Sequence, residues 1–159
     1  MYYANKNIKE VIFFLKEPLD NLLDLQREYQ RFIQKLAKKH DLTIAEWQLL
    51  QRISAGKDSQ EVLSEEMRLD TSTLSRQLGK LTKKAYVLIS KVNNQPNVRT
   101  RKSYQYRLSD LGKKVLAQMN TDFNEFGQKV FAQWSDEEKN FLKILINRLT
   151  QSMSRVKLN

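Results

Sequence analysis

Only four glycines and two prolines interrupt the 159 residues of this chain, and their scarcity constrains its fold more than any other feature. Glycine and proline dominate turns, so a many-stranded sheet is disfavoured and long helices are favoured. Apolar residues recur at spacings of three and four from about Ile8 to Lys39, across Pro18. Because proline is tolerated in the first turn of a helix, this pattern predicts a short amphipathic segment before Glu17 and a longer helix from about Pro18.

Two further predicted helices each begin at a side chain that can accept a hydrogen bond from a free helix amide. In Thr43-Ile-Ala-Glu46 the Thr hydroxyl can accept from the third amide while the Glu reaches back, a capping box that predicts a helix ending near Gly56. Asp58 and Glu61 repeat this spacing and predict a helix from about Ser59 to Arg68.

A third helix is predicted from Thr71 to Lys84, with Asp70 as its N-terminal cap. Leu74, Leu78 and Leu81 fall at positions i, i+4 and i+7 and should face the core. The opposite face then carries hydroxyl, amide and cationic side chains, which can pair with the base edges and phosphates of duplex DNA. The side chains predicted to point outward are Ser72, Thr73, Arg76, Gln77, Lys80 and Lys83.

The positive charge of the chain is concentrated in the same region. From Thr71 to Ser109 there are nine Lys or Arg residues and no Asp or Glu, whereas the other 19 basic residues nearly balance the 18 acidic ones. Like charges gathered on one part of a small protein repel each other, so the pattern indicates a polyanionic partner that relieves the repulsion. Nucleic acid is the obvious candidate.

After Lys84 the apolar pattern changes from helical to alternating. Two short runs, 86–92 and 104–108, are rich in β-branched and aromatic residues and predict strands. The intervening residues 93–102 have turn formers first and cations last, which predicts a β-hairpin with a basic tip, a wing that can lie against a DNA backbone or minor groove. The cations of the tip are Arg99, Arg101 and Lys102.

Each of these features also has a simpler interpretation. The polar face of 71–84 could be an ordinary solvated helix surface, and 93–102 could be a plain surface loop. A helix-turn-helix followed by a basic hairpin nevertheless favours DNA binding. A non-sequence-specific architectural DNA-binding protein and a protein that binds structured RNA are alternatives. An enzyme is disfavoured, because the sequence shows no paired acid and base, no nucleophile arrangement and no phosphate loop.

Four stretches of the sequence form a recognisable series: Leu42-Thr-Ile-Ala-Glu-Trp-Gln-Leu-Leu50, Ser59-Gln-Glu-Val-Leu-Ser-Glu-Glu-Met67, Leu69-Asp-Thr-Ser-Thr-Leu-Ser-Arg-Gln-Leu78 and Arg107-Leu-Ser-Asp-Leu-Gly112. In this order they resemble the MarR family of winged-helix transcriptional regulators. The resemblance implies a mostly α fold with a small β-wing, in which a winged helix-turn-helix lobe is joined to terminal dimerisation helices. It also implies a transcriptional regulator, expected to be a repressor, that binds a pseudo-palindromic operator as a homodimer.

The resemblance further implies which residues contact DNA. Ser72, Thr73, Ser75 and Arg76 match the base-reading and phosphate-anchoring set, while Ser59 and Gln60 match phosphate anchors at the start of the preceding helix. Thr71, the outward residues other than Lys83 and the wing cations complete the predicted DNA-binding set, which is Ser59, Gln60, Thr71, Ser72, Thr73, Ser75, Arg76, Gln77, Lys80, Arg99, Arg101 and Lys102.

Two positions depart from the family pattern. Ala85 stands where a glycine is usual, which makes a left-handed helix end more costly by about 1 kcal/mol. Thr100 stands where an Asp usually lies beside the wing arginines.

The ends of the chain are predicted to form a dimer. Apolar residues recur at helical spacing from about Asp110, and Ser135-Asp-Glu-Glu138 is a capping box for a final helix with an apolar face. A second copy would bury this surface, although a monomer with a thick helical cap is an alternative. The predicted division is 1–40 for N-terminal dimerisation helices, 41–109 for the DNA-binding lobe and 110–159 for C-terminal dimerisation helices, in one integrated domain.

The resemblance also implies a crevice that can hold a small aromatic or acidic effector. Its candidate lining residues are Tyr29, Phe32, His40 and Trp47, although aromatic residues at helical spacing are more often core. With no Cys and one His, we expect neither a metal site nor a cofactor. The sequence lacks a secretory signal and a run of about 18 apolar residues, so we expect a cytoplasmic protein without a membrane partner.

Overall fold

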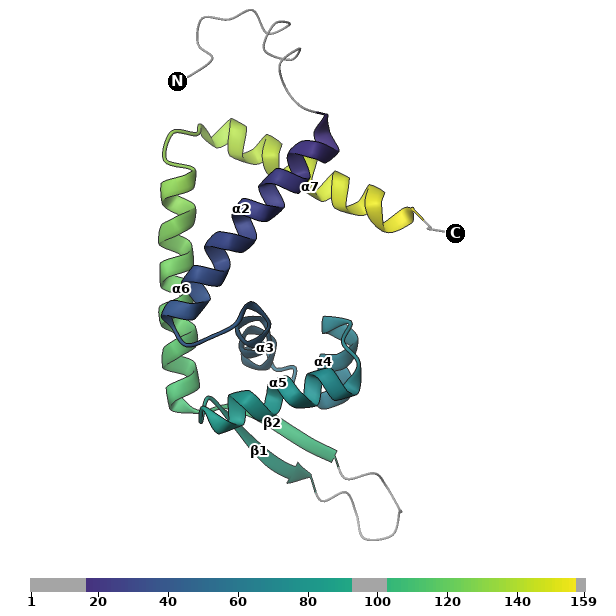
Figure 1. Cartoon of the computed structure of the whole chain (residues 1–159), viewed down its shortest axis with the longest axis vertical. Helices are drawn as coiled ribbons and strands as arrows, with labels where there is room; N and C mark the ends of the chain where they lie inside the picture. The colour runs from purple at the N-terminus through teal and green to yellow at the C-terminus, as the bar shows by residue number, and fades with distance from the viewer. Residues whose placement is uncertain (1–16, 93–102, 157–159) are drawn as a thin grey trace, which may run out of the picture. The chain divides into compact units, whose positions relative to one another are not determined.

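The computed structural model describes residues 17–92 and 103–156, which are mostly helical with one two-stranded antiparallel sheet (Figure 1). The predicted fold class is confirmed. The chain divides into two compact units, Met1–Met119 and Asn120–Asn159. In chain order the elements are α2 (Pro18–Lys39), α3 (Ile44–Ser54), α4 (Gln60–Met67), α5 (Thr71–Lys83), β1 (Val87–Val92), β2 (Ser103–Leu108), α6 (Asp110–Val130) and α7 (Asp136–Arg155).

Most helices begin at the residue that the capping pattern of the sequence predicts. Pro18 occupies the first turn of α2, and the predicted segment before Glu17 lies outside the described residues. At α3 the Thr43 hydroxyl accepts from the Glu46 amide at 3.2 Å, and Glu46 Oε2 accepts from the Thr43 amide at 2.8 Å, which confirms the capping box. Each such cap satisfies amides that the helix leaves without partners.

The predicted cap of α4 is wrong by one residue. Ser59, not Asp58, is the N-cap, and its hydroxyl accepts from the Val62 amide at 3.3 Å. Asp58 instead uses its carbonyl oxygen to accept from the Tyr106 amide at 2.8 Å, and Ser59 forms an isolated antiparallel bridge with Gln105. The pairing with β2 keeps the segment before α4 extended, so the helix begins one residue later than predicted.

Several helices end at a residue in the left-handed conformation, and three of these residues are not glycine. The φ angles are 54° at Asp41, 51° at Arg68 and 57° at Ala85, compared with 86° at Gly56. After α5 the Ala85 amide donates to Thr82 O and the Tyr86 amide to Leu81 O, both at 2.9 Å, the hydrogen-bond pair of a Schellman motif. Ala85 thus takes the conformation for which glycine is usual at this position.

The core of the first unit lies between the helices and the hairpin. Figure 1 shows α3, α4 and α5 gathered beside β1 and β2. Leu residues from all three helices are fully buried, and the paired strand residues Val87 and Leu108 are buried with Tyr106 on the same side of the sheet. The fully buried leucines are Leu49, Leu50, Leu63, Leu74, Leu78 and Leu81.

The sharp turn from the hairpin into α6 is held by Ser109 and Gly112. The Ser109 amide donates to Tyr86 O at 3.0 Å, and its hydroxyl donates to Ala85 O at 2.6 Å and accepts from the Gly112 amide at 2.9 Å. Gly112 has no room for a side chain, since an added Cβ would lie 2.0 Å from Tyr86 O. In the segment Leu108-Ser-Asp-Leu-Gly112, the serine is therefore required for the hydrogen bonds of the turn and the glycine for its close packing.

In the second unit, α7 begins at the capping box predicted from the sequence. The Ser135 hydroxyl accepts from the Glu138 amide at 3.2 Å, and Glu138 Oε2 accepts from the Ser135 amide at 2.7 Å. None of the residues of α7 is buried within the single chain. Across the residues that the structure describes, we find no helix with the length and apolarity needed to span a membrane.

Candidate nucleic-acid interface

Helix α5 has one fully buried face and one polar, cationic face. Leu74, Leu78 and Leu81 are at most 1% exposed, which confirms the predicted inner stripe. The hydroxyl and cationic side chains of the other face reach solvent, and no acidic residue lies within α5. Its exposed residues are Thr71, Ser72, Ser75, Arg76, Lys80 and Lys83, and Thr73 is half-buried.

The N-terminal turn of α5 is fixed by Asp70. One carboxylate oxygen accepts from the Ser72 amide at 3.0 Å, the Thr73 amide at 2.9 Å and the Ser72 hydroxyl at 2.5 Å. The hydrogen bond from the Ser72 hydroxyl, followed by those from Thr73, holds the pKa of Asp70 well below its ordinary value. The exposed hydroxyl of Ser72 is therefore held in one place at the start of the polar face.

Ser59 and Gln60 lie at the start of α4 and are linked to α5. The Gln60 side chain donates from Nε2 to Thr71 O at 3.4 Å, a hydrogen bond near the distance limit. Both residues are half-buried, and the hydroxyl of Ser59 is already used in the cap of α4. The fold therefore brings the predicted anchors on α4 close to the first turn of α5.

Two polar residues of this region turn toward the protein interior, and for one of them, Gln77, this contradicts the prediction. Gln77 was predicted to point outward, but it is half-buried and its Oε1 is buried without a hydrogen-bond partner in the described part of the chain. Lys84 is one of the nine cations between Thr71 and Ser109, the acid-free window, and it points inward and lies 3.1 Å from the buried Glu46. Helical periodicity misplaced Gln77 because its position borders the apolar stripe.

The hairpin adds cations beside those of α5. Lys91 on β1 and Arg107 on β2 are exposed, and Arg107 pairs in register with Leu88 on the face away from Val87 and Leu108. Arg107 was not among the predicted contacts, although the alternation of Tyr104, Tyr106 and Leu108 could have placed it outward. The wing tip, with Arg99, Thr100, Arg101 and Lys102, lies outside the described residues.

The four candidate effector residues differ in their surroundings. Tyr29 on α2 is 48% exposed and Phe32 is half-buried, whereas Trp47 on α3 is buried in the core. His40 is the C-cap of α2 and is half-buried.

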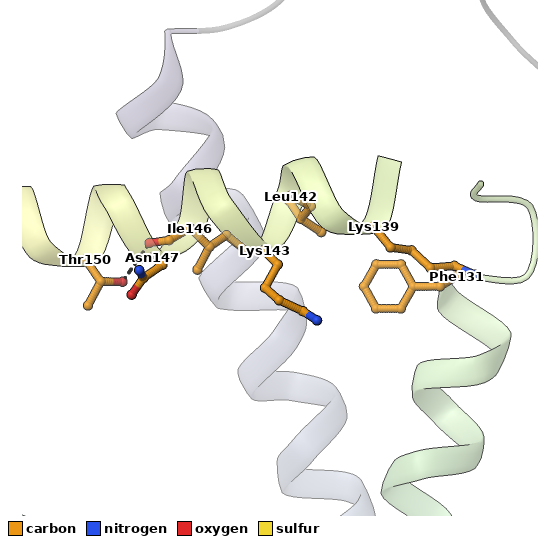
Figure 2. Close-up of a pocket in the computed structure, with 7 residues that line it drawn as sticks. All are labelled: Phe131, Lys139, Leu142, Lys143, Ile146, Asn147 and Thr150. Carbon is orange, nitrogen blue, oxygen red and sulfur yellow. Dashed lines mark hydrogen bonds between the residues drawn. The ribbon is translucent and has the colours of Figure 1, made fainter. Parts of the chain in front are cut away.

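A second surface feature lies within Asn120–Asn159. An apolar groove runs along α7, and Figure 2 shows Leu142, Ile146 and Thr150 on successive turns of this helix, with Phe131 near its start. Thr150 uses its hydroxyl to donate to the carbonyl oxygen of Ile146 at 2.9 Å, so its polar group is satisfied within the helix. The groove therefore presents mainly apolar atoms.

The MarR family sequence model matches residues 40–90, the segment from the end of α2 through α5 into β1. The chain has the MarR-family winged-helix fold. A search of curated proteins found no significant match.

Solved structures of MarR-type regulators have the same fold over most of their length. The S. aureus MepR–DNA complex is 18% identical with a TM-score of 0.67, covering 86% of this chain and 96% of that one. Staphylococcus aureus MarR, in complex with salicylate and kanamycin, is 15% identical with a TM-score of 0.73, covering 87% and 91%. A MarR regulator from Methanosarcina mazei Go1 is 22% identical with a TM-score of 0.66, covering 89% and 100%.

Proposed function

We propose that this MarR-type protein is a sequence-specific, duplex-DNA-binding transcriptional regulator that acts as a homodimer. The observation that carries the proposal is the outer face of α5, where Ser72, Ser75, Arg76, Lys80 and Lys83 are exposed opposite a fully buried leucine stripe. Arginine can donate two parallel hydrogen bonds to guanine, hydroxyls suit either base edges or phosphates, and lysine suits phosphates. The complex of S. aureus MepR with DNA, which has a similar fold, supports the same class of partner.

In this proposal α5 lies in the major groove and the wing at 93–102 lies near the flanking minor groove. Arg76 reads a base, while Ser59 and Gln60 at the start of α4 anchor a backbone phosphate. Arg99, Arg101 and Lys102 supply charge at the wing tip. The local excess of positive charge then increases the affinity for any duplex, and the ordered first turn of α5 positions the side chains that distinguish one sequence from another.

The exposed apolar surface of the terminal helices supports the homodimer. On α2 the side chains of Leu19, Leu23 and Leu25 are all more than half exposed, and on α7 Phe141 and Leu145 are at least 60% exposed. A helix with no buried residue gains little stability by itself, so a second copy that covers α7 explains why the sequence forms it. A two-fold dimer presents its recognition helices about 34–36 Å apart, which suits a pseudo-palindromic operator. Binding at a promoter would then repress by occlusion.

Selection from random duplexes tests the proposal directly. We expect a palindromic consensus whose half-sites are separated by about one helical turn, roughly 10 base pairs. Competition at moderate salt should then favour the selected duplex over random duplex by at least about 10³-fold. No sequence preference would support the architectural alternative instead, and preference for an RNA of matched sequence would support RNA binding.

A small aromatic or acidic effector is a further part of the proposal, suggested by the salicylate complex of Staphylococcus aureus MarR. The candidate residues are Tyr29, Phe32, His40 and Trp47, of which Tyr29 is exposed on α2. Salicylate added to the protein–operator complex should weaken binding, and Tyr29→Ala should reduce this effect without changing operator affinity in its absence. An operator affinity that does not respond to salicylate would remove this effector class.

A further inference from the structure

Lys84, the C-cap of α5, is held inward by two other helices. Its amino group donates to the carbonyl oxygen of Asp41 at 2.6 Å and to Glu46 Oε2 at 3.1 Å. Asp41 is the left-handed residue after α2, and Glu46 is in the first turn of α3. One ammonium group therefore joins the end of α5 to the end of α2 and the start of α3.

The partner of this lysine is an unusual residue. Glu46 is 1% exposed and is the one buried charged side chain in the part of the chain that the structure describes. The same oxygen that accepts from Lys84 also accepts from the Thr43 amide, so the carboxylate serves the capping box and the ion pair together. A buried carboxylate that loses its cation is strongly destabilising, because its desolvation is no longer compensated.

We propose that Lys84 is a positioning residue of the DNA interface, which fixes the C-terminal end of α5 against α2 and α3 and does not itself contact DNA. This inference rests on the proposed function of α5. It separates Lys84 from the other cations of the acid-free window: its side chain is 27% exposed and its ammonium group already donates twice within the protein.

The consequence for binding follows from how the two kinds of DNA contact depend on distance. A hydrogen bond to a base edge weakens steeply outside its narrow range of length and angle, whereas attraction to phosphates falls slowly with separation. Releasing the end of α5 should therefore weaken binding to the preferred sequence and leave binding to random DNA nearly unchanged.

Adjacent lysines provide a matched pair of variants. Lys84→Met keeps the apolar stem and removes the ammonium group, while Lys83→Met removes a neighbouring exposed cation of the same helix. We expect Lys84→Met to weaken the selected duplex by roughly tenfold or more, random duplex by less than about twofold, and to leave the salt slope of binding unchanged. Lys83→Met should weaken both duplexes alike and lower the salt slope by about one. A lower slope in Lys84→Met would show that Lys84 contacts phosphate and would overturn the inference.

A double variant separates positioning from simple loss of stability. Glu46→Gln keeps a capping oxygen for the Thr43 amide, so Glu46→Gln combined with Lys84→Met removes both charges without leaving a buried ion unpaired. We expect the double variant to unfold closer to the wild-type midpoint than Lys84→Met does, yet to retain the weaker binding to the selected duplex. Recovery of that binding together with stability would assign Lys84 a merely structural role and overturn the proposal.

Amide hydrogen exchange of the free protein tests the positioning without DNA. In the double variant the last turn of α5, through Tyr86, should exchange faster than in the wild type, while the first turn capped by Asp70 is unchanged. Unchanged exchange in the last turn would refute positioning by Lys84. Absence of any preferred duplex for the wild-type protein would instead refute the proposed function of α5, so the two failures are distinguishable.

Discussion

Gly112 packs so closely against Tyr86 that a Cβ atom on it would lie 2.0 Å from the Tyr86 carbonyl oxygen. Gly112→Ala must therefore displace either α6 or the backbone after α5, and we expect it to lower the free energy of unfolding by about 3 kcal/mol. Urea unfolding measures this change. Gly79→Ala is the control, because an added Cβ there meets nothing within 4 Å, and removing a helix-interior glycine should stabilise by about 0.5–1 kcal/mol. Equal effects of the two variants would contradict the close contact.

Ala85 should be replaceable by glycine with a gain in stability. At a φ of 57° an alanine pays a steric cost that glycine avoids, so Ala85→Gly should raise the free energy of unfolding by about 1 kcal/mol. For a chain of this size the thermal midpoint should rise by roughly 2–4 °C. Ala55→Gly is the matched control: Ala55 caps α3 at a φ of −81°, so glycine there should not stabilise. A loss of stability in Ala85→Gly would argue against the left-handed conformation.

The Asp70 cap predicts a specific pH dependence. Because the pKa of Asp70 is lower in the folded chain than its ordinary value of 3.8, its contribution to stability is fully present well above that value and is lost as the pH falls below it. Asp70→Ala should therefore lower the thermal midpoint at pH 7, and the difference from the wild type should shrink below about pH 3.8. Asp70→Asn keeps a capping oxygen but not the charge, so at pH 7 its stability should lie between those of Asp70→Ala and the wild type, and it should not share the loss of stability of the wild type below about pH 3.8. A wild-type advantage that persists unchanged at the lowest pH would contradict the lowered pKa.

Arg76 and Lys102 should affect DNA binding in different ways. Arg76→Ala should weaken the selected duplex far more than random duplex, by about 1–3 kcal/mol for each lost base contact. Lys102→Ala should weaken all duplexes and flatten the salt dependence. Titrations of both variants against selected and random duplexes at several salt concentrations measure the two effects. Equal losses for both variants on both duplexes would refute this division of roles.

A charge placed within the apolar stripe of α7 should prevent dimerisation. Leu145 is 60% exposed in the single chain, and Leu145→Asp would bury a carboxylate in the proposed interface. Sedimentation at micromolar concentration should show a dimer for the wild type and a monomer for this variant. Gln151→Asp, at an exposed polar position about 120° around the helix from Leu145, should leave the dimer intact. A wild-type protein that sediments as a concentration-independent monomer would rule out the dimer.

The local features of this fold could be predicted from the sequence because their causes lie within a few residues. The capping pairs Thr43 with Glu46 and Ser135 with Glu138 are three residues apart, and the leucine stripe of α5 follows helical spacing alone. The structure confirms all three. Alanine disfavours the left-handed conformation that Ala85 adopts. The conformation forms there because Ser109, 24 positions later in the sequence, holds the Ala85 carbonyl oxygen by a hydrogen bond.

The features that could not be predicted depend on residues distant in the sequence. Asp58 carries the usual capping signal, but its carbonyl pairs with Tyr106 and the cap passes to Ser59. Nothing in the sequence around Lys84 distinguishes it from the other cations of the acid-free window, because its partner Glu46 lies 38 positions earlier. No local pattern distinguishes a lysine that faces solvent from one that meets a buried carboxylate.

The pairing between Asp58 and Tyr106 has a consequence for how such a lobe can be controlled. Because the segment before α4 is bridged to the middle of β2, the helix that precedes α5 and the hairpin belong to one body. A tilt of that body would turn α5 and the hairpin, the two parts proposed to contact DNA, through the same angle, so neither would leave the DNA alone. Control by an effector would then need a single rotation of each lobe and no separate signal to the hairpin.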